Sequence, residues 1–266
     1  MKSKIMIVAL ALMMIMGVQS AKAWATWGHH IVAYIAEQHL TPETKSKCED
    51  YLHHKVTHYS LWQDYWRNTF PFKASNDWHM NHVDENYNTI GIKRNINRDV
   101  VTQLNRIIGE MSKGQYHNMS DSLVNVNLKL LIHMMGDMHC PSHVGYHKNS
   151  GLKIPSIQIG KTKTHYHGFW DGAPQYMHPK WKADNFLKVC DTYSEKEIAK
   201  IQKGNPTKWA KENAEKMVKI FTYWDEDANI KTLSPEQRKM IDDTAFEQLA
   251  FAGYRLAAVL NAIFAK

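Results

Sequence analysis

Apolar residues recur every three or four positions over most of the chain, and this spacing predicts a mainly helical protein. The clearest long helix spans residues 236–264, which have one apolar face. Residues 29–39 show the same period over a shorter stretch. A buried helix is predicted over residues 120–138, with a stripe formed by Leu123, Val126, Leu130, Leu131, Met134, Met135 and Met138.

Local signals mark where helices begin and where a hairpin interrupts them. LTPET at 40–44 and LSPEQ at 233–237 each place Thr or Ser before Pro and Glu, which is typical of a helix N-terminus. Within residues 151–164, the stretch KIPSIQIG alternates apolar and polar side chains, as a small β-hairpin does. No repeat or flexible linker is visible. We therefore expect one mainly α-helical domain over residues 24–266, with one small β-hairpin.

Residues 5–18 form a nearly continuous apolar run. It follows Lys2 and Lys4 and precedes Ala21-Lys22-Ala23, a pattern typical of a secretory signal peptide with its cleavage site. The run is shorter than the roughly 18 residues expected of a membrane span. We expect residues 1–23 to be removed and the protein to be exported, either to the periplasm or out of the cell. We also expect a monomer without stable membrane insertion.

Charge and cysteine content narrow the class of protein only slightly. The chain has a net charge of +7, part of it from the lysines of the leader, which suits a polyanionic partner without demonstrating one. Three cysteines, Cys48, Cys140 and Cys190, exclude a disulfide scaffold and allow at most one bridge, whose pairing stays open. Sixteen histidines suggest metal binding in an exported protein, although scattered surface histidines would give the same count.

The segment HMMGDMHCPSH, residues 133–143, carries the strongest chemical signal. His133 and Asp137 are four residues apart on an apolar helix, so their side chains project from one face. A buried carboxylate is costly unless it is paired or binds a metal. Gly136 permits close approach of another group, and Pro141 ends the helix before His143. A lone pair at this spacing would be weak evidence, but the added glycine, proline and third histidine favour a metal site.

Three further patches supply the same donor types. HGFWD repeats the four-residue spacing with His167 and Asp171, and WQDYWR contains Asp64 and Arg67. WHMNHVD contains His79 and His82. Imidazole and carboxylate donors together suit zinc, and the absence of a cysteine-pair motif favours a catalytic over a structural ion.

The chain resembles the zinc-dependent single-strand nucleases of the S1/P1, or mung-bean, family in four motifs that occur in the family's order: WATWGHH at 24–30, WQDYWR, HMMGDMHCPSH and HGFWD. It also resembles them in AFAGYRLAAVLN of the last helix. The resemblance spans nearly all of the predicted mature chain. It implies a mainly α-helical fold, shared with bacterial zinc phospholipases C, that holds three zinc ions in a cleft. It also implies single-stranded DNA, RNA and nucleotides as partners.

The resemblance implies a ligand set for each ion. In the family, an amino-terminal tryptophan binds one zinc through its free amine and carbonyl oxygen, and a histidine follows five positions later. Here these are Trp24 and His29, so cleavage after Ala23 would create a ligand. Asp137 would bridge this ion to a second. The remaining ligands implied are Asp64, His79 and His133 for the second ion, and His143, His167 and Asp171 for the third.

The resemblance also covers positions that contact the water, the phosphate and the base, and not all of these are the same in this chain. Asp64 would orient the attacking water, and Arg67 matches a cationic position that faces the phosphate. Spacing from Asp64 favours His79 as the ligand, with His82 as the alternative. In the family a Phe, an Asp and an Asn contact the base, whereas the matching positions here are Met80, His82 and Leu152. The base-binding pocket is therefore expected to differ.

The resemblance implies an endonuclease that cleaves single-stranded DNA and RNA to 5′-phosphate ends, with removal of 3′-phosphates from nucleotides as a further activity. Two alternatives stay open. A zinc phospholipase C of the same fold would use Glu where this chain has Asp171. A non-catalytic zinc-binding protein would need neither Arg67 nor a bridging Asp137.

Overall fold

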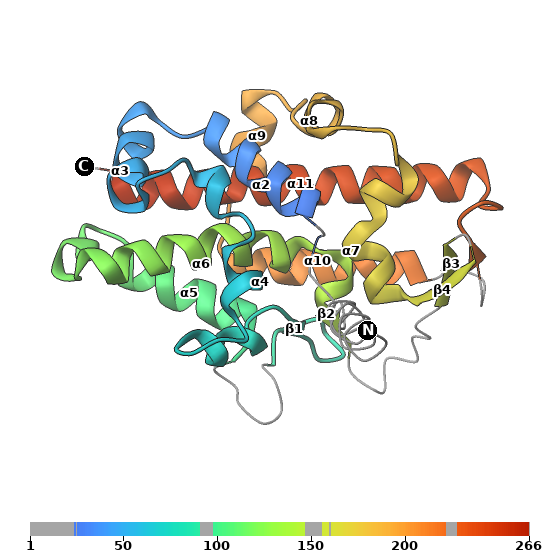
Figure 1. Cartoon of the computed structure of the whole chain (residues 1–266), viewed down its shortest axis with the longest axis horizontal. Helices are drawn as coiled ribbons and strands as arrows, with labels where there is room; N and C mark the ends of the chain where they lie inside the picture. The colour runs from blue at the N-terminus through green and yellow to red at the C-terminus, as the bar shows by residue number, and fades with distance from the viewer. Residues whose placement is uncertain are drawn as a thin grey trace, which may run out of the picture.

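The computed structural model describes residues 24, 26–90, 98–146, 156–159, 161–221 and 228–265. The predicted signal peptide and Leu152 therefore lie outside the described residues. The chain is mainly helical, which confirms the predicted fold class (Figure 1). The α-helices are α2 (Thr26–Gln38), α3 (Pro42–Leu52), α4 (Trp62–Trp66), α5 (Val100–Met111), α6 (Asp121–His139), α7 (Tyr166–Met177), α8 (Ala183–Cys190), α9 (Glu195–Ile201), α10 (Pro206–Phe221) and α11 (Pro235–Phe264).

The helix starts predicted from LTPET and LSPEQ are confirmed. The Thr41 hydroxyl accepts a hydrogen bond from the backbone N–H of Thr44 at 3.2 Å, and Pro42 is the first residue of α3. Ser234 and Gln237 form a reciprocal capping box at the start of α11. These side chains satisfy backbone N–H groups that the first turn of a helix leaves without partners, and so fix where each helix begins.

The core forms where α2 and α6 pack against α11, which runs along the length of the molecule in Figure 1. At Gly253 of α11, an added Cβ would lie 2.6 Å from Cβ of Ile35 on α2, so the two helices are in close contact there. The stripe predicted for α6 is buried except near its start. Leu123 is 46% exposed although Val124 beside it is fully buried, so its side chain points away from the core and its prediction as a core residue was wrong.

The predicted hairpin is present, but it belongs to a slightly larger sheet. Strand β3 (Ser156–Ile159) pairs antiparallel with β4 (Thr162–His165), and β5 (Ala228–Asn229) pairs parallel with β3. A separate two-residue pair joins β1 (Asn81–His82) to β2 (Val144–Gly145) in parallel. This second pair brings the segment after His79 beside the segment after His143.

The described residues settle two questions left by the sequence. Cys48, Cys140 and Cys190 are all buried and unbonded to one another, so none forms a disulfide. No helix within the described ranges has both the length and the apolar character needed to cross a bilayer.

A buried polar network joins α6 to α11. His139 donates from Nδ1 to the carbonyl oxygen of Met135 at 2.8 Å and accepts at Nε2 from Arg255 at 3.0 Å. Arg255 also donates to Glu212 at 2.7 Å. Burial, together with the Arg255 charge, lowers the pKa of His139 to about 3.

This network predicts a loss of stability in acid. Unfolded His139 would titrate near pH 6.5, so between pH 6.5 and 3 the unfolded chain binds a proton that the folded chain does not. The free energy of unfolding should therefore fall as the pH drops, by about 2 kcal/mol between pH 7 and 5 from this group. Urea unfolding of the chelator-treated His139→Gln variant should show a correspondingly flatter pH dependence. His54→Gln, at an exposed histidine, should match the parent, and parallel curves for all three proteins would contradict the assignment.

Candidate metal centre

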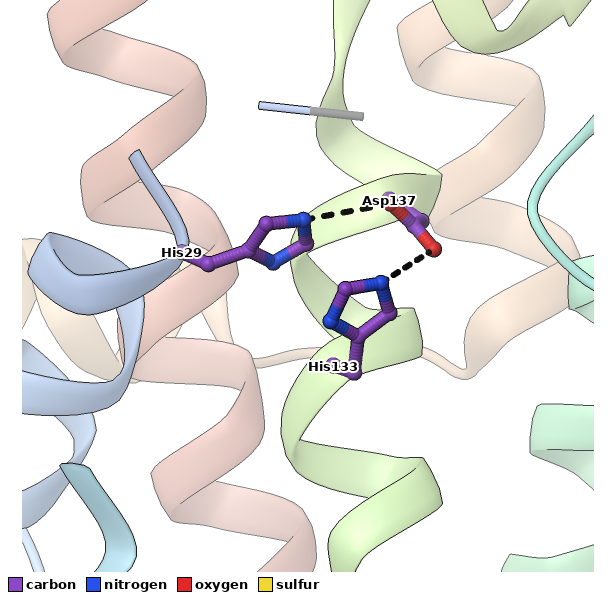
Figure 2. Close-up of side chains that lie close together, drawn as sticks. All are labelled: His29, His133 and Asp137. Atoms are coloured by element: carbon purple, nitrogen blue, oxygen red, sulfur yellow. Dashed lines mark ion pairs between the residues drawn. The ribbon is translucent and has the colours of Figure 1, made fainter. Parts of the chain in front are cut away.

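Helices α2 and α6 bring three polar side chains together inside the bundle. Figure 2 shows His29 of α2 facing His133 and Asp137 of α6. His29 Nε2 lies 3.4 Å from Asp137 Oδ1, and His133 Nε2 lies 3.3 Å from Asp137 Oδ2. The two imidazole rings stack with their centroids 3.9 Å apart. The four-residue spacing in α6 thus places both of its side chains toward α2.

Gly136 makes this approach of α2 to α6 possible. A Cβ at this position would lie 2.7 Å from Nδ1 of His29, closer than side chains tolerate. Even alanine at position 136 would therefore displace the His29 ring from Asp137.

A second group lies on the other side of Asp137. His79 Nδ1 is 2.6 Å from Asp137 Oδ2, and His133 Nε2 is 3.8 Å from Asp64 Oδ1. Asp64, His79 and His133 offer ligand atoms that all lie within 4.8 Å of one another. His82 instead packs on Gly145, where an added Cβ would be 2.5 Å from its ring. This geometry favours His79 over the alternative His82.

The third group joins the start of α7 to the turn after α6. His143 Nε2 lies 3.8 Å from Asp171 Oδ1, and His167 Nε2 lies 3.6 Å from Asp171 Oδ2. His143 Nδ1 also approaches Asp137 to 3.6 Å, which connects this group to the others. Each predicted histidine ligand thus lies within 3.8 Å of a predicted carboxylate ligand.

Outside the cluster, these histidines and aspartates have few hydrogen-bond partners, so their nitrogen and oxygen atoms are available to bind a ligand. One of the few bonds present is from His133 Nδ1 to the carbonyl oxygen of Ser60, at 2.8 Å. It leaves the lone pair of Nε2 directed at the carboxylates. Buried polar atoms are almost always paired, so a cluster of unpaired ones fits a bound cation. The unpartnered atoms are both ring nitrogens of His29, His79 and His143, Nε2 of His133 and His167, and both carboxylate oxygens of Asp64 and Asp137.

The electrostatics of the cluster suit metal binding. Burial would raise the pKa of Asp137, but His133 and His79 outweigh it and hold that pKa well below its usual range. Burial raises the pKa of Asp64 and Asp171. It lowers the pKa of His143 to about 3, so this ring is neutral near pH 7, as a metal ligand must be. Buried histidine nitrogens and carboxylate oxygens are the donors that zinc binds in proteins.

Arg67 follows α4 and lies between the second and third groups. Its Nη2 atom is 3.7 Å from Asp64 Oδ1, and its charge contributes to the lowered pKa of His167. The guanidinium is buried, as a cation that receives an anionic ligand beside the metal ions would be.

Trp24 is fully buried, and its side chain packs against Gly28, where a Cβ would be 2.6 Å from Cβ of Trp24. Its backbone N–H approaches the Cys140 thiol and moderates the raised pKa of that group. Its role as a metal ligand stays a prediction. Of the positions matched to base contacts, Met80 and His82 are half-buried beside His79.

Two residues that contact Asp171 were not predicted from the sequence as part of the site. Ser142 donates from its hydroxyl to Asp171 Oδ1 at 3.1 Å, and the Cys140 thiol lies 3.8 Å from the same oxygen. Cys140, His143 and Asp171 form a candidate metal group of their own, in which Cys140 takes the place expected of His167. Both residues lie inside HMMGDMHCPSH, but no spacing rule distinguishes them from helix-ending residues.

Comparison with known proteins identifies this arrangement. The family model for S1/P1 Nuclease matches residues 24–265. The chain belongs to the S1/P1 nuclease family. Nuclease P1 of Penicillium citrinum is 26% identical over 90% of this chain and 97% of its own length. Nuclease S1 of Aspergillus oryzae is 26% identical over 92% of this chain and 93% of its own, and Endonuclease 1 of Arabidopsis thaliana is 22% identical over 97% and 93%.

Membership confirms the family recognised from the four motifs. It establishes the protein as a nuclease, a hydrolase of phosphodiester bonds from a zinc-dependent family. The substrate of this S1/P1 nuclease is therefore a nucleic acid.

Proposed function

We propose that the protein is an exported, three-zinc endonuclease that cleaves single-stranded DNA and RNA to 5′-phosphate ends and also removes 3′-phosphates from nucleotides. One observation carries this proposal. Three groups of buried donors, made up of histidines, aspartates and Cys140, meet around Asp137, and many of their polar atoms have no other partner. The relatives named as nucleases P1 and S1 support the same substrate class.

The proposed ligands follow the three groups. Trp24, His29 and Asp137 would hold one ion. Asp64, His79, His133 and Asp137 would hold the second, and His143, His167 and Asp171 the third. Zinc ions in such a cluster supply Lewis acidity that makes water a nucleophile at neutral pH and stabilises charge on phosphate oxygens.

Two side chains of this chain would act directly on the substrate. The Asp64 carboxylate would accept a hydrogen bond from the attacking water and orient it toward phosphorus. The Arg67 guanidinium, 3.7 Å from that carboxylate, would donate to the non-bridging oxygens, whose negative charge grows as the water attacks. Asp64 would then fix the direction of attack, and Arg67 would stabilise the transition state.

Export is the second part of the proposal. It rests on the basic and apolar leader and on the small residues that end at Ala23. Residues 24–266 would form the mature nuclease domain, either in the periplasm or outside the cell. Amino-terminal sequencing of the protein recovered from a secreting host tests this directly, with Trp24 as the expected first residue.

The substrate form gives a prediction for activity. The zinc-loaded protein should cleave a single strand at least about 100-fold faster than an intact duplex, because unpairing and unstacking a base costs a few kcal/mol. Since Met80 and His82 replace the base contacts of the family, base preference should be relaxed. Initial rates on single-stranded DNA, its duplex and phosphatidylcholine test these points. Equal rates on both DNA forms would refute the preference, and cleavage of the lipid alone would indicate a phospholipase C.

A further inference from the structure

Three exposed aromatic residues lie close along the chain to Asp64 and Arg67 of the metal centre. Among the described residues, Tyr65, Trp66 and Phe70 are the most exposed large hydrophobic side chains, at 64%, 48% and 96%. Scattered exposed apolar residues are ordinary, but these three lie within six positions of one another. We call Tyr65, Trp66 and Phe70 the aromatic patch.

The segment that carries the patch is held in place from both sides. The carbonyl oxygen of Trp66 accepts hydrogen bonds from the backbone N–H of Thr69 at 2.9 Å and from its hydroxyl at 2.7 Å. The ring of Phe72 packs edge-on against Trp62, with centroids 4.7 Å apart. In the same segment, the buried side chain of Gln63 donates from Nε2 to the carbonyl oxygen of Ser75 at 3.2 Å. Two of the aromatic residues thus belong to α4 and the third to the turn that follows it, so little backbone freedom remains to be lost on binding.

Along the chain, the patch adjoins the catalytic groups. Asp64 and Arg67 are three residues apart and point together into the metal centre, while Tyr65 and Trp66 lie between them and face solvent. A phosphate at Arg67 would place the neighbouring nucleotides of a strand next to these rings. The guanidinium provides the charge that attracts a polyanion, and the rings provide flat apolar faces.

The residue that follows the ligand histidine does not provide such a face. Position 80 holds a half-buried methionine, so a base beside the metal ions meets a thioether instead of a ring. A nuclease that grips unpaired bases by stacking needs its aromatic surface elsewhere. The aromatic patch is the nearest such surface along the chain to Asp64 and Arg67.

We propose that the aromatic patch binds the bases of single-stranded nucleic acid that flank the cleaved phosphate, and so selects unpaired strands. This inference rests on the proposed function and assigns Trp66 and Phe70 as specificity-determining residues. Stacking requires exposed base faces, which a duplex hides within its own stack. It also tolerates every base, in agreement with the relaxed base preference expected above.

The test measures binding of a fluorescent, cleavage-resistant phosphorothioate single strand to the zinc-loaded protein by anisotropy. The double variant Trp66→Ala, Phe70→Ala should bind it about tenfold more weakly, which corresponds to about 1.4 kcal/mol. The variant Trp66→Phe, Phe70→Tyr keeps two rings and should bind within about twofold of the parent. Tyr34→Ala removes a 39% exposed aromatic from α2 and should have no effect.

An abasic strand of the same length separates stacking from charge. It keeps the phosphates but has no bases, so the parent and the double alanine variant should bind it equally. Equal losses on the abasic and normal strands, or unchanged binding of the normal strand, would overturn the proposal. Hydrolysis of bis(4-nitrophenyl) phosphate by the parent protein reports on the proposed function separately, because this small diester needs the metal centre and spans no neighbouring base.

Discussion

Replacing Asp137 by alanine is expected to abolish nucleic acid cleavage and to remove two of the three metal ions that we propose. Its carboxylate approaches His29 at 3.4 Å, His79 at 2.6 Å, His133 at 3.3 Å and His143 at 3.6 Å. Without it, two ions would each lose an anionic ligand, and the surrounding imidazoles would lose the charge that compensates bound cations. The value of kcat/KM should fall more than about a thousandfold, since metal ions contribute several kcal/mol to such reactions.

Asp171→Ala provides the matched control for metal content. Asp171 approaches only His143 and His167 among the predicted histidine ligands, so its loss should remove one ion and leave the other two. Metal analysis of dialysed proteins, with circular dichroism to verify folding, gives the stoichiometries. Equal metal contents in the two variants would refute a shared role for Asp137, and one ion or none in the parent would refute the three-ion cluster.

Adding Gly-Ser before Trp24 of the mature protein is expected to remove one zinc ion and to lower the cleavage rate by about 100-fold or more. A free α-amine has a pKa near 8, so its deprotonated form is readily available to a metal, whereas an amide nitrogen has no such lone pair. The fold should survive, because the buried Trp24 side chain would keep its place against Gly28.

A cleavable extension provides the control for this experiment. A protease that cuts directly before Trp24 should restore both the zinc ion assigned to Trp24 and the activity in the same sample. Full zinc content and full activity in the uncut protein would show that Trp24 is only a packing residue, and that removal of the leader does not build the site.

Local patterns predicted helices α2, α3, α6 and α11, because the signals for each come from residues close in sequence. The caps at Thr41 and Ser234 and the shared face of His133 and Asp137 follow from spacing alone. The packing of α2 against α6 does not follow from spacing, because it depends on tertiary contacts. The spacing implied that Gly136 admits a neighbour, but only the fold shows that the neighbour is His29.

Other features left too little signal in the sequence. Strands β1 and β2 are two residues long, which is too short for alternation to appear, yet they bring His79 and His143 into one site. Leu123 has helical spacing but lies on the exposed side of the first turn of α6. The hydrogen bond from Ser142 to Asp171 joins residues 29 positions apart. Spacing rules do not reach across such separations, so the family resemblance supplied the ligand set.

The position of α11 has a consequence for when activity first arises during biosynthesis. Every predicted ligand lies between residues 24 and 171, but α2 rests closely on Gly253 of α11, and α6 packs on the same helix. A ribosome therefore completes all the ligand-bearing segments before it makes the helix that supports two of them. Until α11 emerges, His29 and Asp137 have no complete scaffold to hold them together. A growing chain of this nuclease is therefore expected to lack the complete site until α11 has been made, so the order of synthesis sets the earliest point at which the site can form.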